Sequence, residues 1–110
     1  HFVSVGYHRR FSPLPDVTAT FVDAGHILGS SLVRLDLHND GDPVRLGYLC
    51  DLGRAEMPIL RDPEPVTLDG GKLDALVIES TYGDRLHKQL HPSIEELYTA
   101  IEDTFARGGT

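Results

Sequence analysis

The chain has 110 residues, a formal net charge of −7 and 40% hydrophobic residues. This length corresponds to one domain at most, and no apolar run approaches the ~20 residues that a membrane-spanning helix needs. The acidic charge, with scattered lysines and arginines, argues against a nucleic-acid-binding surface formed by this segment alone, because such surfaces normally show clustered basic residues. Cys50 is the only cysteine, so an internal disulfide is excluded and a reducing, cytoplasmic location is expected.

The first part of the chain predicts two strands separated by a loop. Residues 2–6 predict a short strand, whereas residues 7–15 predict a loop, because its prolines obstruct regular strand pairing. Residues 17–22 alternate with the two-residue period of a strand. Gly25 ends that strand, and a glycine-flanked loop carrying His26 follows it.

A hairpin is predicted next, and it has a consequence for two candidate site residues. Residues 31–38 and 44–49 both show strand alternation, and the Asn39-Asp40-Gly41-Asp42 sequence between them is typical of a turn. His26 and Asp51 lie just outside the two open ends of this hairpin. Because an antiparallel hairpin brings its first and last residues side by side, we expect His26 and Asp51 to lie close in space.

The second half of the chain predicts one more strand. Residues 54–71 contain three prolines and predict an irregular segment, in which residues 57–60 can form a short helical turn. Residues 74–78 are almost continuously apolar, as expected of a buried strand. Glu79 follows directly, and a carboxylate at the end of a buried strand is a common place for a functional residue.

A C-terminal helix has good local support. Ser93, followed by Glu96 three positions later, fits a capping box at the start of a helix. Apolar residues then recur at helical spacing, and we expect this stripe to pack in the core: Ile94, Leu97, Tyr98, Ile101 and Phe105. Arg107 and the Gly108-Gly109 pair predict the end of the helix.

Three short blocks carry residue types suited to hydrolytic metal chemistry. They are Asp23-Ala24-Gly25-His26-Ile27-Leu28-Gly29-Ser30, Cys50-Asp51-Leu52-Gly53-Arg54 and Glu79-Ser80-Thr81-Tyr82-Gly83-Asp84-Arg85. Histidine and carboxylate are ligands of hydrolytic zinc sites, and a carboxylate can bridge two metal ions because it has two oxygens. A further carboxylate near the leaving group can position a histidine that acts as an acid.

With these blocks in this order, the chain resembles the metallo-β-lactamase-fold nucleases of the β-CASP group, which include the nuclease subunit of the cleavage and polyadenylation specificity factor. The resemblance covers roughly residues 17–110. It implies an α/β fold in which residues 1–110 form part of a metallo-β-lactamase αββα sandwich, with a mostly antiparallel or mixed sheet and a C-terminal helix. It also implies that this part precedes the inserted β-CASP domain.

The resemblance assigns roles to three residues. His26 matches a zinc-binding histidine of the family, Asp51 matches the aspartate that bridges two zinc ions, and Glu79 matches the acidic residue that orients the catalytic proton donor. The implied activity is metal-dependent hydrolysis of phosphodiester bonds in RNA, with two Zn²⁺ ions, or Mn²⁺, as cofactors. RNA is the implied partner, single-stranded DNA is an alternative substrate, and a homo-oligomer or a processing complex is a further expectation.

Two departures from the family pattern are visible. The His-x-His-x-Asp-His loop of the family is absent, so we expect it before residue 1, and we expect the final histidine and the β-CASP domain after residue 110. Cys50 stands where the family usually has glycine. Its thiol either perturbs the metal pocket or points away from Asp51, and we favour a packing role, because free cysteines are commonly buried.

Other interpretations stay open at this point. A histidine in a glycine-flanked loop is often structural, and a carboxylate at a strand end can simply cap the next turn. The chain can also be a non-catalytic scaffold of the same fold in an RNA-processing complex, or another metallo-hydrolase of the fold. The sequence does not distinguish RNA from DNA as substrate, or endonucleolytic from exonucleolytic cleavage, and it is silent on oligomeric state.

Overall fold

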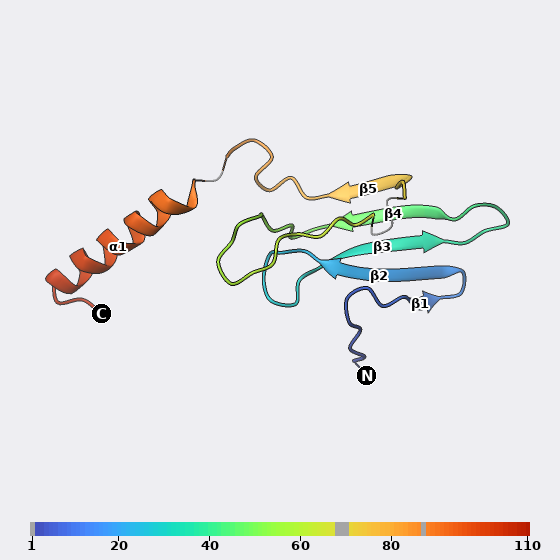
Figure 1. Ribbon diagram of the computed structural model, residues 1–110, viewed down its shortest axis with the longest axis horizontal. Helices are drawn as coiled ribbons and strands as arrows, with labels where there is room; N and C mark the ends of the chain where they lie inside the picture. Colours follow the sequence, from blue (N-terminus) through green and yellow to red (C-terminus); the bar gives the residue numbers. More distant parts are fainter. Residues whose placement is uncertain (1, 68–70, 87) are drawn as a thin grey trace. The chain divides into compact units, whose positions relative to one another are not determined.

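A computed structural model describes residues 2–67, 71–86 and 88–110 of the chain. The chain divides into two compact units, one that ends at Glu79 and one that covers Ser80–Thr110. The first unit contains the β-sheet and the second contains the helix (Figure 1). In the described part of the chain, no helix has the length and apolar character needed to cross a membrane.

The first unit is built around a mixed sheet. Within the described ranges it has five strands in sequence order, shown as arrows in Figure 1: β1 (Phe11–Leu14), β2 (Val17–Asp23), β3 (Ser31–Leu37), β4 (Val44–Leu49) and β5 (Ala75–Ile78). Strands β1 to β4 are antiparallel, whereas β5 pairs with β4 in parallel. With one helix after the sheet, the described chain is an α/β structure, as predicted.

The central hairpin of the sheet confirms the prediction from sequence. Strands β3 and β4 pair in the register Val33 opposite Tyr48 and Leu37 opposite Val44. The turn between them is supported by Asn39, whose side-chain oxygen accepts the backbone N–H of Gly41 at 3.0 Å. The strand predicted over residues 17–22 is also present, as β2.

The N-terminal region differs from the prediction. Residues 2–6 form no strand, and the position beside β2 is taken by β1, in a segment for which the sequence predicts a loop. Pro13 is accommodated because β1 pairs with β2 only and its register with β2 shifts between Phe11 and Leu14. An edge strand with an irregular register tolerates a proline, because the missing N–H is not needed for a second ladder. The ring centroids of Phe11 in β1 and Phe21 in β2 lie 5.1 Å apart, so the two side chains pack against each other.

The core of this unit is small. Val22, Ala24, Leu32 and Val66 are buried together, and Leu49, Leu52 and Leu73 pack against them half-buried. Val22 and Leu32 are opposite each other in the β2–β3 register, so they lie on the same face of the sheet. This core lies at the end of β2 where the chain enters the His26 loop, and it therefore supports that loop directly.

A buried group of charged residues extends the same face of the sheet. Arg34 is 4% exposed and Asp36 is 6% exposed, and the Arg34 Nε and Nη2 atoms both donate to Asp36 Oδ1 at 3.1 Å. Arg45 Nε lies 3.5 Å from the same oxygen, and Arg34 Nη1 donates to the Thr67 carbonyl at 3.4 Å. Arg34 and Asp36, at alternate positions of β3, are thus buried as an ion pair. Charged side chains are tolerated in the interior mainly when they are paired in this way.

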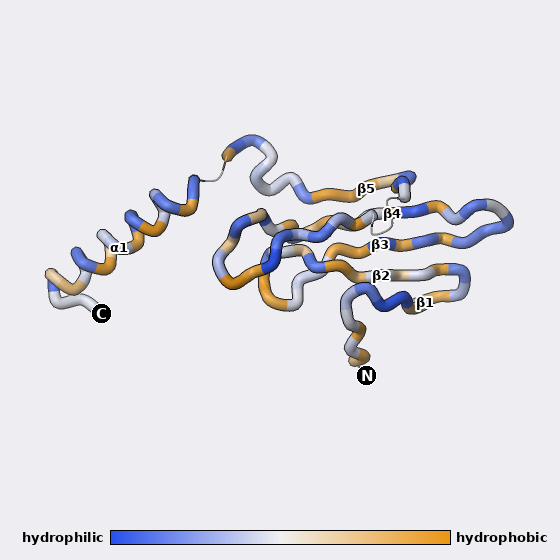
Figure 2. The backbone as a smooth tube through the Cα atoms, viewed as in Figure 1, coloured by the Kyte–Doolittle hydropathy of each residue, from blue (hydrophilic) through white to orange (hydrophobic). Residues whose placement is uncertain are grey.

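Strand β5 is present as predicted, but its burial is not. All four residues of Ala75–Ile78 are exposed, so the expectation of a buried strand is wrong for the described chain. Figure 2 shows β5 as a mainly hydrophobic stretch. An apolar run indicates that a strand is suited to burial, but burial itself depends on what packs on both faces.

The sequence predicts a short helical turn over residues 57–60. Residues 58–60 lie in turns and bends, and the segment forms no helix.

The helix of the second unit, α1 (Leu90–Ala106), begins earlier than predicted. Its N-cap is Gln89, so Pro92 and Ser93 lie inside the first turn and there is no Ser93–Glu96 capping box. Proline is tolerated in the first turn because N–H groups there have no partner within the helix. The Ser93 hydroxyl instead donates to the Gln89 carbonyl at 2.9 Å, and Lys88 Nζ contacts Glu96 Oε1 at 2.7 Å.

The end of α1 agrees with the prediction. Gly108 has a φ of 73°, its N–H donates to the Phe105 carbonyl at 2.9 Å, and the Gly109 N–H donates to the Thr104 carbonyl at 2.9 Å. These bonds form the Schellman arrangement that ends many helices. The apolar stripe is present in Figure 2 as alternating colours along α1, but its five residues are 45–70% exposed, so a core role is not found in the described structure.

Candidate functional site

The β3–β4 hairpin places His26 and Asp51 on one pocket. Both side chains are exposed, and both line a shallow pocket of about 230 Å³ together with Ile27, Leu28, Gly29, Ser30, Ser31 and Cys50. The two residues are 25 positions apart in sequence and line one pocket because β3 begins beside the end of β4. This confirms that they lie close in space, which the hairpin predicted.

The His26 loop is shaped by polar side chains at its two ends. Asp23 Oδ1 accepts the Gly25 N–H at 2.9 Å, and Gly25 turns the chain with a φ of 61°. Ser30 Oγ accepts the N–H groups of His26 and Ile27, each at 3.2 Å, and donates to the Ile27 carbonyl at 2.9 Å. The N–H groups of Gly25, His26 and Ile27 thus have local side-chain acceptors, and His26 is exposed at the pocket.

The Asp51 loop is fixed by a backbone contact with the His26 loop. The Gly53 N–H donates to the Ala24 carbonyl at 2.8 Å. A Cβ atom on Gly53 would overlap the carbonyl group of Gly25, so only glycine allows this approach. Asp51 has a left-handed backbone with a φ of 52°, which aspartate tolerates better than most residues.

Glu79 joins the site from the end of β5. Its N–H donates to the Leu49 carbonyl at 3.2 Å, which continues the β4–β5 pairing by one residue. Its Oε1 accepts the backbone N–H of Leu52 at 2.6 Å. The structure therefore brings the predicted residue Glu79 to the residue that follows Asp51 in the chain.

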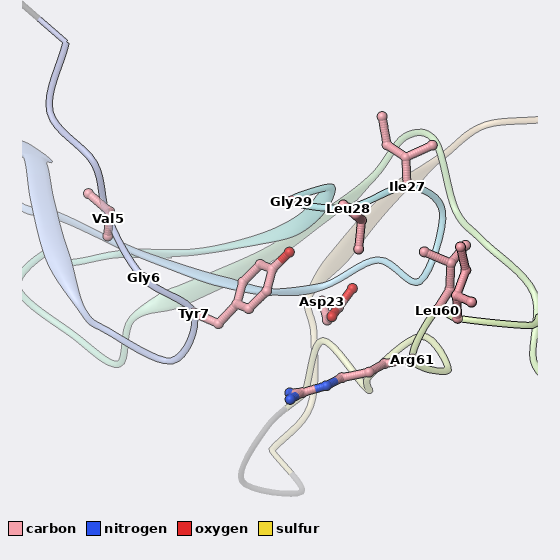
Figure 3. Close-up of a pocket in the computed structure, with 10 residues that line it drawn as sticks. Val5, Gly6, Tyr7, Asp23, Ile27, Leu28, Gly29, Leu60 and Arg61 are labelled. Carbon is pink, nitrogen blue, oxygen red and sulfur yellow. The ribbon is translucent and has the colours of Figure 1, made fainter.

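A second and larger pocket also lies beside the His26 loop (Figure 3). It has a volume of about 520 Å³ and shares Ile27, Leu28 and Gly29 with the first pocket. In Figure 3 the Arg61 side chain extends toward the side formed by Tyr7 and Asp23. The pocket thus combines an apolar rim with one cationic, one anionic and one phenolic group.

Tyr7 connects the N-terminal segment to the site through a hydrogen bond. Its hydroxyl donates to the Ser30 carbonyl at 2.7 Å, across 23 positions of sequence. Burial raises the pKa of Tyr7 above its usual value of 10.0, the carboxylates of Asp23 and Glu64 raise it further, and Arg61 opposes them. The phenol is therefore kept neutral and serves as a hydrogen-bond donor to the His26 loop.

Cys50 takes part in a contact that the sequence did not indicate. A hydrogen bond with the Cys50 side chain raises the pKa of Tyr48, with smaller contributions from the charges of Cys50 and Asp51 and from burial. Tyr48 and Cys50 are two positions apart at the end of β4, so their side chains lie on the same side of the chain. Cys50 is half-buried and lines the same pocket as His26 and Asp51.

The donor set of the first pocket fits a metal ion in part. An imidazole and a carboxylate are suitable ligands for zinc, and both reach the same pocket from the surface. In the described residues, no group of three or more His, Cys, Asp or Glu side chains could hold a metal ion. His26 and Asp51 are thus two side chains of ligand type on one pocket, and a metal site that used them would need further donors from outside the described residues.

Several residues of this site escaped prediction from the sequence. Ser30 and Leu52 act through backbone geometry, and Tyr7 reaches the site from a segment for which the sequence predicts a loop. Ser30 had a detectable signal, because a serine following a glycine-rich loop commonly bonds the backbone of that loop. Leu52 had none, because its N–H is common to all residues except proline.

Comparison with known proteins gives several relatives at about 30% identity. Ribonuclease TTHA0252 of Thermus thermophilus is 33% identical over 84% of this chain and 20% of its own length. Transcription termination factor FttA of Thermococcus kodakarensis is 32% identical over 99% of this chain and 16% of its own. An RNase J-like protein of Methanocaldococcus jannaschii is 30% identical over 96% of this chain and 24% of its own.

The chain thus spans about a fifth of the length of these curated relatives. No family model matches the chain. The similarity covers nearly all of the present chain, including both loops that line the first pocket. It relates the chain to proteins named for ribonuclease activity and for transcription termination.

Proposed function

We propose that this chain is part of a metallo-β-lactamase-fold nuclease of the β-CASP group that hydrolyses phosphodiester bonds in RNA. The observation that carries the proposal is the convergence of His26 and Asp51 on one pocket, beside a loop that Glu79 contacts. The names of the relatives favour the same conclusion, since two of the three are named as RNases and the third as a termination factor.

The proposed roles follow from the chemistry of each side chain. His26 would hold a metal ion through its neutral imidazole, and Asp51 would hold two ions with its two carboxylate oxygens. Bound divalent metal, Zn²⁺ or Mn²⁺, would supply a nucleophile at neutral pH and neutralise charge on the phosphate. Glu79 would orient the proton donor for the leaving group, as the family resemblance implies.

The missing donors also form part of the proposal. The family's His-x-His-x-Asp-His loop and its final histidine would complete the site from the rest of the full-length protein. RNA would reach the pocket from its open side, where the side chains of His26 and Asp51 are exposed. Because this segment is acidic, basic residues elsewhere in the protein would hold the phosphate backbone. The protein would act in the reducing cytoplasm, as a homo-oligomer or within a processing complex.

Cleavage of single-stranded RNA by the full-length protein tests this function. The wild-type protein should cleave in the presence of Mn²⁺ or Zn²⁺ and stop on chelation. Asp51→Ala should lower the rate at least about a hundredfold, because even residues that only support a metal ligand cost 10- to 100-fold. Asp42→Ala, in the exposed turn between β3 and β4, is the matched control and should cleave at the wild-type rate.

The result also distinguishes the alternatives. Metal binding by the wild-type protein without cleavage of RNA or single-stranded DNA would favour a scaffold of the same fold. Hydrolysis of a thioester or a lactam in place of a nucleic acid would favour another metallo-hydrolase. Equal cleavage by wild type and Asp51→Ala would contradict the proposed site.

A further inference from the structure

The carboxylate of Glu79 accepts a hydrogen bond from the backbone of the loop that carries Asp51. Glu79 is half-buried at the end of β5, and its Oε1 accepts the Leu52 N–H at 2.6 Å. Its own N–H is bonded to the Leu49 carbonyl, so the main chain of Glu79 is anchored to the end of β4. Glu79 is therefore bonded on both sides of Asp51, through its N–H to Leu49 and through its carboxylate to the N–H of Leu52.

Leu52 is the only residue between Asp51 and the contact that Gly53 makes with the His26 loop. The Gly53 N–H is bonded to the Ala24 carbonyl at 2.8 Å, and the side chain of Leu52 packs half-buried against the Val22 core cluster. The Leu52 N–H belongs to the peptide group that follows Asp51. Its direction therefore depends on the backbone angles of Asp51, whose φ is 52°.

An aspartate in the left-handed region needs such support. That region is unfavourable for residues with a side chain, and a sharp turn there persists only when the surroundings determine it. A hydrogen bond from a backbone N–H to a carboxylate is stronger than one to a neutral acceptor, because the acceptor is charged. Glu79 provides that acceptor on one side of Asp51, and Gly53 provides the fixed contact with the His26 loop on the other.

We propose that Glu79 is a positioning residue that holds the Asp51 loop through the Leu52 N–H, and so directs the Asp51 carboxylate toward His26. This inference rests on the proposed function, in which those two side chains hold metal. It assigns Glu79 an action on the metal ligand Asp51, separate from the orientation of a proton donor.

Two substitutions separate the positioning contact from the charge. Glu79→Gln keeps an oxygen that can accept the Leu52 N–H, whereas Glu79→Ala removes it. Glu102→Gln, on the exposed surface of α1, is the matched control. All variants are made in the full-length protein, and thermal unfolding by circular dichroism checks that each is folded.

Amide hydrogen exchange at Leu52 is the readout that needs no metal. We expect Glu79→Ala to speed exchange of the Leu52 N–H at least about tenfold, because the bond that protects it is lost. Glu79→Gln, whose neutral oxygen is a weaker acceptor than the carboxylate, should exchange more slowly than Glu79→Ala, and Glu102→Gln should exchange like the wild type. Unchanged protection of Leu52 in Glu79→Ala would overturn the positioning role. If Glu79→Ala does not fold, Glu79→Asp, whose side chain is one methylene shorter, takes its place, and unchanged protection of Leu52 in that variant would overturn the positioning role.

Mn²⁺ affinity, measured by electron paramagnetic resonance, is the second readout. Glu79→Ala should bind Mn²⁺ about 10- to 100-fold more weakly, as is typical when a residue that orients a metal ligand is removed, and Glu79→Gln should restore the affinity. Wild-type affinity in a folded Glu79→Ala protein would overturn the inference. Normal Leu52 protection in a wild-type protein that binds no Mn²⁺ would instead contradict the proposed function, while the loop contact would stand.

Discussion

The backbone N–H of Gly53 donates to the carbonyl oxygen of Ala24 at 2.8 Å, and this bond joins the two loops that carry Asp51 and His26. Both residues follow a strand of the same sheet: Ala24 comes after β2 and Gly53 comes after β4. Because β3 lies between those strands, the bond connects the loop after β2 with the loop after β4 at one end of the sheet. This main-chain bond thus contributes to the position of the Asp51 loop relative to the His26 loop.

Gly53→Ala should destabilise the protein and separate the two loops. The added Cβ would overlap the Gly25 carbonyl group, and this main chain has little room to move, because a Cβ on Gly25 would itself lie 2.7 Å from Pro63. We expect a loss of about 1–3 kcal/mol in the free energy of unfolding by urea, as for overpacked sites. Gly6→Ala is the control, since a Cβ added at Gly6 would have no atom within 4 Å, and it should change the value by less than about 0.5 kcal/mol.

His26→Ala should weaken Mn²⁺ binding by the full-length protein and leave its stability nearly unchanged. The imidazole is exposed, whereas the loop is held by the backbone bonds to Ser30, so removing the ring disturbs no packing. His91→Ala, at an exposed position on α1, is the control and should keep wild-type affinity. Electron paramagnetic resonance of Mn²⁺ measures the effect, and equal affinity in both variants would contradict a ligand role for His26.

Asp36→Ala should be among the most destabilising single changes in the sheet. It would remove the carboxylate that accepts from Arg34 Nε and Nη2, and breaking such a buried ion pair costs about 3–5 kcal/mol. Replacing both residues, as Arg34→Met with Asp36→Leu, should recover part of that loss, because the buried Arg34 charge is removed together with the carboxylate, whereas Arg45 still loses its contact with Asp36. Asp40→Ala, in the exposed turn, is the control. Urea unfolding gives all three values, and a small effect of Asp36→Ala alone would contradict the burial of this pair.

Tyr7→Phe should lower stability at neutral pH by about 1 kcal/mol, through loss of the hydrogen bond to the Ser30 carbonyl. The substitution should also change how the free energy of unfolding depends on pH in alkaline solution. Since the pKa of Tyr7 is raised above 10.0 in the folded state, its contribution is fully present below pH 10 and is lost as the pH rises through the folded pKa. The free energy of unfolding of the wild type should therefore fall above pH 10, and less so in Tyr7→Phe.

The control for that experiment is Tyr98→Phe, which changes an exposed phenol on α1. Urea unfolding at neutral pH and at several values on either side of the usual tyrosine pKa gives the comparison. If Tyr7→Phe and the wild type lose stability in parallel above that pKa, the phenol of Tyr7 does not contribute in the way that its surroundings indicate.

Gly108→Ala should loosen the C-terminal turn of α1. Gly108 has a φ of 73°, and a residue with a Cβ is destabilised by about 1–2 kcal/mol in this region. The bonds from Gly108 and Gly109 to the carbonyls of Phe105 and Thr104 should weaken, so their amide hydrogen exchange should accelerate roughly tenfold. Gly6→Ala again serves as the control, and unchanged exchange at both amides would contradict the left-handed cap.

Local pattern and turn chemistry were enough to predict β2, the β3–β4 hairpin and the end of α1. The alternation of residues 31–38 and 44–49 and the turn at residues 39–42 together predicted that His26 and Asp51 lie close in space, because a hairpin brings the open ends of its two strands side by side. Glycine at positions 108 and 109 indicated the helix end, since few other residues adopt the left-handed conformation that the cap requires.

Tertiary structure decided the features that depend on what lies next to a segment. Residues 11–14, and not residues 2–6, form the edge strand, because a strand exists only where a partner accepts its hydrogen bonds. Strand β5 and the apolar stripe of α1 are exposed, since hydrophobic periodicity identifies a face without determining what covers it. The bond from the Leu52 N–H to Glu79 also emerged only in three dimensions, because a backbone N–H carries no sequence signal and the parallel β4–β5 pairing alone brings that carboxylate to it.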